Sequence, residues 1–334
     1  MLDPAAAERL RGRKNLLAFS GGADSTALFH LLLDAGIGFD VAHVNYRTRP
    51  QSDAEASGAA ELAKRHGKRF FLREAEPIEK NFEAQARRVR YAFFDEIAQT
   101  FGYETVLTAH QLDDRLEWLL MRLCKGAGLP EMLGMKTLEE REHYTLVRPL
   151  LGRTKAELKS WLLDRGHPWF EDESNGDERF GRNRIRRRFA APLLEEWREG
   201  IGASFRFLER DAAALGGIGA TEDFGELLYL ETTGDRLQLM RAVDRWLKTR
   251  GYLMRKGDRE RILHENEVVI GRRYALSVGD TFALLAPVEK TTAPKPFRER
   301  CRRLGIGPAV RPFLYRNPDL FNALLRRLAP GNGG

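Results

Sequence analysis

The first half of the chain alternates between short apolar runs and longer stretches with helical periodicity. Apolar runs typical of buried strands occur at residues 16–19, 39–44, 69–72 and 105–108. The intervening stretches repeat apolar residues every three or four positions and predict helices at 25–36, 52–66 and 81–101. Strands that alternate with helices and are apolar on both faces indicate a parallel sheet covered on each side. The predicted fold class is therefore α/β, with a doubly wound parallel sheet.

The second half follows a different pattern. Helices are predicted at 155–165, from near Arg182 onward, and from Gly225 to about Arg250. Three short apolar runs, separated by turns at Gly271 and Gly279-Asp280, predict strands at 267–270, 274–278 and 281–285. Glycine-containing segments at 199–202 and 215–219 indicate a hinge. We expect two domains, residues 1–200 and a smaller, mostly helical region 201–334 with a short β-meander.

Charge and cysteine content narrow the possible functions. The 334 residues carry a net charge of +7, which is compatible with a polyanionic partner. Cys124 and Cys301 are the only cysteines and lie far apart, so the sequence supports neither a disulfide framework nor a zinc site. No apolar run approaches the roughly 18 residues of a membrane span, and the first residues lack a signal-peptide core. We expect a cytoplasmic protein with no membrane contact and no evident protein partner.

Polar residues follow four of the predicted strands at the point where each strand ends. These residues are Ser20, Asn45, Arg73 and His110. Ligands of doubly wound sheets bind beyond the carboxyl ends of the strands. The four side chains therefore predict a site at this edge.

The first strand leads into Ser20-Gly21-Gly22-Ala23-Asp24-Ser25 and then into a helix. Two glycines let the backbone approach a ligand closely, Asp24, Ser25 or Thr26 can cap the helix, and a helix N-terminus attracts phosphate. A strand-to-helix turn without a ligand has the same local pattern. The lysine of the common nucleotide-binding loop and the third glycine of dinucleotide folds are both missing. The motif resembles the PP-loop of the ATP pyrophosphatase superfamily, which implies a Rossmann-like domain that binds ATP through all six residues.

A second motif follows the fourth strand. His110, Asp113, Asp114 and Glu117 share one face at the start of a helix whose other face is apolar. The carboxylates could hold Mg²⁺ or a cationic substrate, and His110 could handle protons. The same carboxylates could instead only stabilise the helix dipole.

Arginines supply the remaining candidate groups. Glu83, Arg87 and Arg90 lie along one face of the 81–101 helix, where they suit phosphate binding or a surface ion pair. Five arginines occur between residues 182 and 188, beside Ile185, which belongs to an apolar stripe. Such a cluster favours contact with a phosphodiester backbone.

In chain order, these motifs resemble the tRNA(Ile)-lysidine synthetase family. The matching residues span about the first 200 positions and comprise Ser20–Ser25, His43-Val44-Asn45, Glu83, Ala86-Arg87, Arg90-Tyr91, Thr108-Ala109-His110, Asp113-Asp114, Glu117, Arg148-Pro149-Leu150-Leu151, Asp172, Ser174-Asn175, Arg182-Asn183 and Ile185-Arg186. The resemblance implies a ligase that adenylates the C2 oxygen of the first anticodon cytidine of tRNA(Ile) with a CAU anticodon. Free L-lysine then attacks C2 to give lysidine, and AMP and pyrophosphate are released.

The resemblance also implies individual roles. Asp24 would lie near Mg²⁺ or the attacked phosphorus, with Asp113 as a second candidate metal ligand. Asp114 and Glu117 would bind the ammonium group of lysine. Arg87 and Arg182 would position phosphate or cytidine, and His110 would support the transfer. The tRNA would contact Arg182, Asn183 and Arg186 as well as the region 201–334.

Four positions depart from the family pattern, namely Tyr46, Gln111, Arg115 and Trp118. Two other functions remain open. An ATP-dependent tRNA 2-thiolation enzyme would use the same loop but needs cysteines in a suitable arrangement, and Cys124 and Cys301 lack that spacing. A tRNA-binding protein without catalysis is expected to have lost residues 20–25 or Glu117, which are present here.

Overall fold

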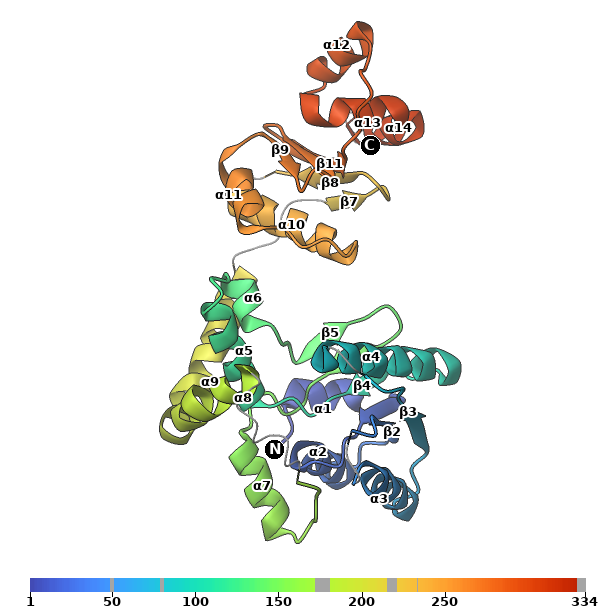
Figure 1. Ribbon diagram of the computed structural model, residues 1–334, viewed down its shortest axis with the longest axis vertical. Helices are drawn as coiled ribbons and strands as arrows, with labels where there is room; N and C mark the ends of the chain where they lie inside the picture. Colours follow the sequence, from blue (N-terminus) through green and yellow to red (C-terminus); the bar gives the residue numbers. More distant parts are fainter. Residues whose placement is uncertain (49–50, 79–80, 172–180, 215–220, 233, 329–334) are drawn as a thin grey trace. The chain divides into compact units, whose positions relative to one another are not determined.

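The computed structural model describes residues 1–48, 51–78, 81–171, 181–214, 221–232 and 234–328. The chain divides into two compact units, residues 1–214 and 215–334 (Figure 1). The boundary expected at residue 200 falls inside α9 (Ala191–Ala214), so it is corrected to residue 214. The expected hinge at 199–202 is therefore wrong, because this segment is helical. The second expected hinge, 215–219, lies outside the described residues.

The first unit contains a six-stranded sheet in the order β3-β2-β1-β4-β6-β5. All neighbouring strands are parallel except the β5–β6 pair. The predicted parallel sheet is confirmed, while the short β5 and β6 at its edge were not predicted. The strands are β1 (Asn15–Ala18), β2 (Asp40–Asn45), β3 (Phe70–Glu74), β4 (Thr105–Leu107), β5 (Leu138–Glu140) and β6 (Thr145–Val147).

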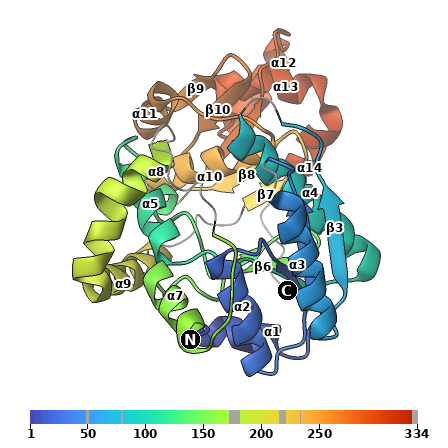
Figure 2. The ribbon, with the colours of Figure 1, turned by 60° about the horizontal axis from the view of Figure 1, so that its bottom comes forward.

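Both faces of the sheet are buried along its central strands β2, β1, β4 and β6, which explains their continuous apolar runs. Leu17 of β1 packs into a core with α1 (Pro4–Leu10), α2 (Ala23–Asp34), α3 (Ser52–Arg65) and α7 (Lys155–Asp164). Leu16, its neighbour, faces the opposite side and packs against α4 (Phe82–Phe101). Figure 2 shows α2 and α7 side by side beneath the sheet.

A separate apolar cluster positions the arginine-rich segment. Leu112 and Leu116 of α5 (Leu112–Leu123) pack with Leu133 of α6 (Leu129–Leu133) and with Leu194 and Phe205 of α9. The chain reaches α9 through α8 (Gly181–Ile185) and a π-helical turn (Arg186–Ala190). Packing of this turn on α5 brings the predicted arginine cluster beside the predicted acidic helix.

The second unit is built on an antiparallel sheet in the order β7-β8-β11-β10-β9. The predicted meander is confirmed as β9 (Glu267–Ile270), β10 (Tyr274–Val278) and β11 (Phe282–Pro287). The helix predicted from Gly225 to about Arg250 is wrong in its first part, because Leu228–Glu231 forms β8, paired with β7 (Thr221–Asp223). In β8, Leu228 and Leu230 face one core and Tyr229 faces the other, so its apolar run is that of a strand buried on both faces.

Helices cover both faces of the second sheet. One face carries α10 (Arg236–Thr249) and α11 (Lys256–His264). The other carries α12 (Lys295–Arg303), a 3₁₀ turn (Pro308–Val310), α13 (Arg311–Arg316) and α14 (Pro318–Leu328). Cys301 is buried within this unit, while Cys124 is exposed in the first, and both are free thiols. In the described ranges, no helix is both long and apolar enough to cross a bilayer.

Candidate active site at the carboxyl edge of the sheet

The loop after β1, residues 20–25, is stabilised by hydrogen bonds from its own side chains. Gly21 has a φ of +82°, a conformation that favours glycine. Ser25 Oγ accepts a hydrogen bond from Ser20 N at 3.2 Å and donates to Gly22 O at 3.1 Å. The N-cap of α2 is Gly22, so the prediction that Asp24, Ser25 or Thr26 caps this helix is wrong. With a glycine at the cap, the start of α2 presents backbone amides and a positive dipole without a covering side chain.

Asp24 stands in the first turn of α2 and carries an unsatisfied carboxylate. Its Oδ1 is buried and has no hydrogen-bond partner among the described residues. Burial raises the pKa of Asp24 to about 6, against the attraction of Lys155 and with a further rise from Asp114 and Asp113. A buried, unpaired carboxylate oxygen is costly unless a ligand satisfies it. It is a suitable ligand for Mg²⁺, which often binds one or two carboxylates together with substrate phosphates.

A cavity of about 270 Å³ opens beside this loop. Its walls come from the ends of β1, β2 and β4 and from α2, α4 and α5: Ala18, Phe19, Ser20, Asp24, Ser25, Ala42, Val44, Tyr46, Arg90, Phe94, Thr108, Ala109, His110 and Asp114. Of the four polar residues expected at this edge, Ser20 and His110 line the cavity. Asn45 instead donates to Asp53 at 2.7 Å, and Arg73 pairs with Glu96 at 2.5 Å. The prediction that the polar residues after these strands form one site therefore holds for two of the four residues.

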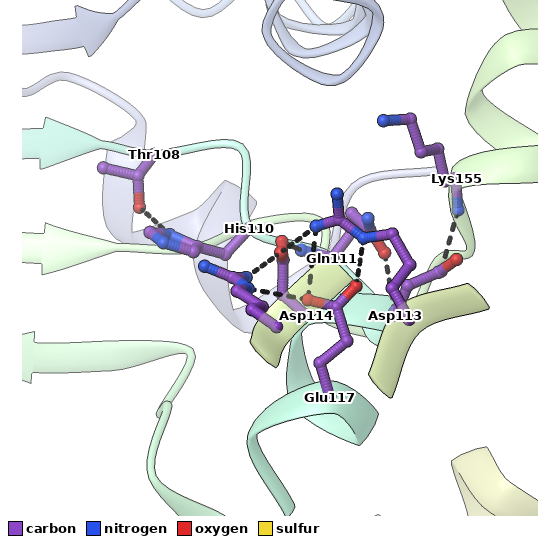
Figure 3. Close-up of polar contacts among 9 residues, drawn as sticks. Thr108, His110, Gln111, Asp113, Asp114, Glu117 and Lys155 are labelled. Atoms are coloured by element: carbon purple, nitrogen blue, oxygen red, sulfur yellow. Dashed lines mark hydrogen bonds and ion pairs between the residues drawn. The ribbon is translucent and has the colours of Figure 1, made fainter. Parts of the chain in front are cut away.

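His110, which lines this cavity, is held in the neutral form. Its Nδ1 lies 2.9 Å from Thr108 Oγ1 (Figure 3). Burial, together with the positive charges of four nearby arginines, lowers the pKa of His110 to about 3. The arginines, in decreasing order of influence, are Arg148, Arg90, Arg182 and Arg87. Because Thr108 engages Nδ1, Nε2 is the ring atom that a substrate can meet.

The acidic residues of α5 separate into different roles. Gln111 caps the helix, accepting from Asp113 N at 2.6 Å, while Gln111 N donates to Asp114 Oδ2 at 3.1 Å. Asp113 Oδ2 accepts from Lys155 N at 3.0 Å and so binds the start of α7 (Figure 3). Burial raises the pKa of Asp113, with the hydrogen bond from Lys155 acting in the opposite direction. Asp113, one of the predicted acidic residues, thus connects α5 to α7.

Asp114 and Glu117 are already engaged by two arginines. Arg182 donates through Nη2 to Asp114 Oδ1 at 2.6 Å and through Nε to Glu117 Oε2 at 2.7 Å. Arg186 Nε donates to Glu117 Oε1 at 2.5 Å. Glu117 is 1% exposed. Although burial opposes it, these carboxylates raise the pKa of both guanidinium groups, which stay charged. The two predicted lysine-binding carboxylates and two of the predicted tRNA-binding residues, Arg182 and Arg186, therefore form one ion-pair network.

The other predicted arginine lies apart from this network. Arg87 is exposed on α4, and its guanidinium lies 4.7 Å from the centre of the Tyr91 ring. Its charge still contributes to the low pKa of His110. Asn183 lies in α8 between the two paired arginines. Asp172, Ser174 and Asn175, which contributed to the family resemblance, lie outside the described residues.

Tyr46 and Arg90 also line the cavity, although neither was assigned an individual role in the reaction. Tyr46 OH donates to Ala86 O at 2.9 Å and accepts from Arg90 Nε at 3.3 Å. The sequence marked Arg90 by its place on the same helical face as Glu83 and Arg87, and it marked Tyr46 as a departure from the family pattern. Buried Arg148, which also influences His110, donates to Glu139 at 2.7 Å.

The remaining departures from the family pattern have packing roles. Arg115 is buried against the Phe205 ring and pairs with Glu209 at 2.6 Å, which ties α5 to α9. Trp118 Nε1 donates to Glu131 O at 2.8 Å and ties α5 to α6. These two residues therefore support the helix that carries Asp114 and Glu117.

Comparison with known proteins agrees with the fold and the loop. A family model described as a PP-loop domain matches residues 3–193, more than half of the chain. The protein is therefore a PP-loop protein. A structure of the U34-tRNA thiolase NcsA from Methanococcus maripaludis has the same fold, with a TM-score of 0.52 and 16% identity over 65% of this chain and 80% of that one.

Sequence relatives define the family more closely. A tRNA(Ile)-lysidine synthase from Wolinella succinogenes is 43% identical over 92% of this chain and 94% of the relative. Those from Helicobacter pylori and Campylobacter jejuni are each 38% identical over 92% of this chain, covering 90% and 94% of the relatives. The chain belongs to the tRNA(Ile)-lysidine synthase family.

Proposed function

We propose that this enzyme forms a carbon–nitrogen bond between free L-lysine and the first anticodon cytidine of tRNA(Ile) with a CAU anticodon. ATP adenylates the C2 oxygen of the base and releases pyrophosphate. The ε-amine of lysine then attacks C2 and AMP leaves. The observation that carries the proposal is the shared cavity, which is lined both by the phosphate loop with Asp24 and by His110 and Asp114. We further propose that the reaction takes place in the cytoplasm.

The loop forms the ATP end of the site. The amides at the start of α2 would bind phosphate oxygens, and the helix dipole favours negative charge there. The residues present fit a magnesium ion, because Asp24 has a buried carboxylate oxygen without a partner. Asp24 would hold the Mg²⁺ ion, which would neutralise negative charge on the phosphates. Asp113 is a weaker candidate, because one of its oxygens already accepts from Lys155 N.

The ion-pair network forms the amino-acid end. Asp114 and Glu117 carry two negative charges, and Arg182 and Arg186 balance them with two positive charges. An ammonium group can enter only where it replaces an arginine contact, because unpaired charge is costly in a buried site. We propose that lysine binding moves one arginine away from the carboxylates. The displaced guanidinium then becomes available for a phosphate or for the carboxylate of lysine.

Neutral His110 suits a position between the two ends. An imidazolium there would add positive charge beside four arginines, whereas a neutral ring can accept or donate one hydrogen bond at Nε2. We propose that His110 orients the cytidine or the attacking amine. Excluding water and fixing both partners supply much of the acceleration expected of such a reaction.

The tRNA would meet the arginines of the first unit and the basic helices of the second. Arg182 donates to the cavity residue Asp114, and Arg186 Nη2 lies 4.0 Å from the same carboxylate. Asn183 follows Arg182 in α8. In the second unit, α12 contains Arg298, Arg300, Arg302 and Arg303. Arginine-rich surfaces bind the phosphate backbone and make affinity strongly dependent on salt.

The direct test is transfer of radiolabelled lysine to a transcript of tRNA(Ile) with a CAU anticodon, in the presence of ATP and Mg²⁺. We expect label in the tRNA and AMP in equal amounts. The same transcript with uridine as the first anticodon base is the matched control and should accept no lysine.

Two outcomes would contradict this function. Binding of the tRNA without ATP-dependent lysine transfer would favour a non-catalytic tRNA-binding protein. Incorporation of sulfur would favour 2-thiolation, although exposed Cys124 and buried Cys301 lie in different units of the chain.

A further inference from the structure

A short segment after α7 connects that helix to the phosphate loop. This segment, residues 169–171, is here called the strap. Glu171 Oε1 accepts from Lys159 Nζ at 2.7 Å and from Trp169 Nε1 at 2.9 Å, which holds one end of the strap to α7. The Lys159 ammonium also lies 5.9 Å from the centre of a Trp169 ring. The strap therefore has an anchor outside the cavity.

Phe170, in the middle of the strap, contacts the phosphate loop through its backbone. Its N–H donates to Gly21 O at 3.0 Å. Thr26 Oγ1 donates to the same oxygen at 3.3 Å. The carbonyl of Gly21 and the N–H of Gly22 belong to one rigid peptide plane. Two donors that fix the direction of this carbonyl therefore also fix the direction of the Gly22 N–H.

The ring of Phe170 lies in a gap that two glycines leave open. A Cβ atom at Gly21 would lie 3.1 Å from Phe170 Cδ2, and a Cβ atom at Gly58 of α3 would lie 2.9 Å from Phe170 Cζ. The ring thus packs between the loop and α3, and any larger residue at Gly58 would push it out. This contact resists a change in the backbone of Gly21, which already has a φ of +82°.

Phe170 does not owe its place to burial, nor does it touch the cavity. Its side chain is 40% exposed. The residues that line the cavity include Ser20, Asp24 and Ser25 of the loop, but the strap is not among them. A half-exposed phenylalanine contributes less to the core than a buried one, so its position against two glycines needs another reason.

We propose that Phe170 is a positioning residue for ATP, which holds the Gly21–Gly22 peptide in the orientation that binds phosphate. The proposal rests on the proposed function insofar as the loop binds ATP. Phe170 acts through the loop and contacts neither substrate nor reacting atoms. Loss of the ring leaves the backbone hydrogen bond but frees the loop to sample other orientations.

The first test removes the ring. Phe170→Ala should raise the KM for ATP about tenfold and change kcat less, because misplacing a binding group weakens binding before chemistry. Titration calorimetry with α,β-methylene ATP and Mg²⁺ should show the same loss of affinity without any turnover. Phe170→Tyr keeps the ring and should restore both values. Phe101→Ala is the matched control, since Phe101 is 36% exposed and packs on Phe71 in β3, away from the loop.

The second test displaces the ring from the other side. Gly58→Ala places a methyl group against Phe170 and should also raise the KM for ATP. Alanine is the better helix former, so the melting temperature should stay equal or rise. A purely structural role for this contact predicts the opposite, a lower melting temperature with an unchanged KM.

A double variant tests whether Gly58→Ala acts through the ring of Phe170. In Gly58→Ala/Phe170→Ala the methyl group meets no ring, so ATP affinity should equal that of Phe170→Ala alone. Unchanged ATP affinity in both single variants would overturn the positioning role while leaving the proposed function intact. Failure of the unmodified enzyme to bind α,β-methylene ATP would instead contradict the proposed function itself.

Discussion

Two acidic positions of the same site differ in how their charge is satisfied. Asp24 of the loop has a buried oxygen with no partner among the described residues, and burial raises its pKa to about 6. Glu117 of α5 is more deeply buried, yet Arg182 and Arg186 engage both of its oxygens. Burial alone therefore does not tell where a ligand binds. Under the proposed function, the unsatisfied carboxylate would hold a cation, and the satisfied one would exchange an arginine contact for the substrate.

The largest effect on lysine transfer is expected at Asp24, whose carboxylate oxygen is unsatisfied among the described residues. Asp24→Ala should reduce lysine transfer by about 100-fold or more, in line with the loss of one group that stabilises charge in a transition state. Because the variant removes a buried carboxylate without a partner, its thermal stability should not fall. Turnover and melting temperature measured together test both statements.

Asp34→Ala, on the exposed end of the same helix, is the control and should leave both quantities unchanged. Near-normal turnover of Asp24→Ala would remove Asp24 from the ATP end of the site.

At Glu117, whose carboxylate is satisfied by two arginines, substitution should lower the stability of the fold, unlike substitution of Asp24. Glu117→Ala leaves two guanidinium groups without their main partner and should cost about 2 kcal/mol of unfolding free energy, less than in a fully buried pair because the arginines are partly exposed. It should also raise the KM for lysine about tenfold, the loss of roughly one charged contact. Chemical denaturation and lysine titration measure the two effects.

Glu140→Ala is a suitable comparison, since Glu140 forms an exposed pair with Arg9. An unchanged lysine requirement in Glu117→Ala would leave Glu117 with a purely structural role.

The raised pKa of Asp24 predicts a pH dependence with a definite sign. The folded-state pKa of about 6 lies above the ordinary value of 3.8, so the native state binds this proton more tightly than the unfolded state. The contribution of Asp24 to stability is present below pH 4 and is lost as pH rises through 6. Asp24→Asn lacks this loss, so its advantage over the unmodified protein should grow between pH 4 and pH 7.

The measurement is the free energy of unfolding without Mg²⁺ or nucleotide, because a bound cation would itself stabilise the carboxylate. Parallel stability curves for the two proteins would contradict the raised pKa.

The smallest effect is expected at Tyr46. Tyr46→Phe removes the hydroxyl that bridges Arg90 and Ala86 but keeps the ring. Loss of one such hydrogen bond is worth about 1 kcal/mol, which corresponds to a two- to fivefold fall in kcat/KM. Tyr315→Phe in α13 changes an exposed hydroxyl of the second unit and serves as the control. Steady-state kinetics with saturating lysine should show a lower kcat/KM for Tyr46→Phe and an unchanged one for Tyr315→Phe.

Local pattern was sufficient for much of the fold. The strands β1 to β4 of the first sheet and the meander of the second were predicted, because short apolar runs bounded by helical patterns or turn residues are typical of strands. The strands β5, β6 and β7 were missed, and β8 was taken for helix. These strands have only three or four residues, and a run of that length fits either structure unless, as for the equally short β1 and β4, it alternates with predicted helices.

The sequence by itself determined the phosphate loop and the order of its polar residues, because two glycines before a helix constrain the backbone locally. Tertiary structure alone decided which charges meet. Arg182 and Glu117 are 65 residues apart and pair only because α8 and the following turn pack on α5. Phe170, in the segment that follows α7, contacts Gly21 in the same way, across about 150 residues of chain. Side-chain pairing across such distances follows from packing of whole elements, which no local pattern encodes.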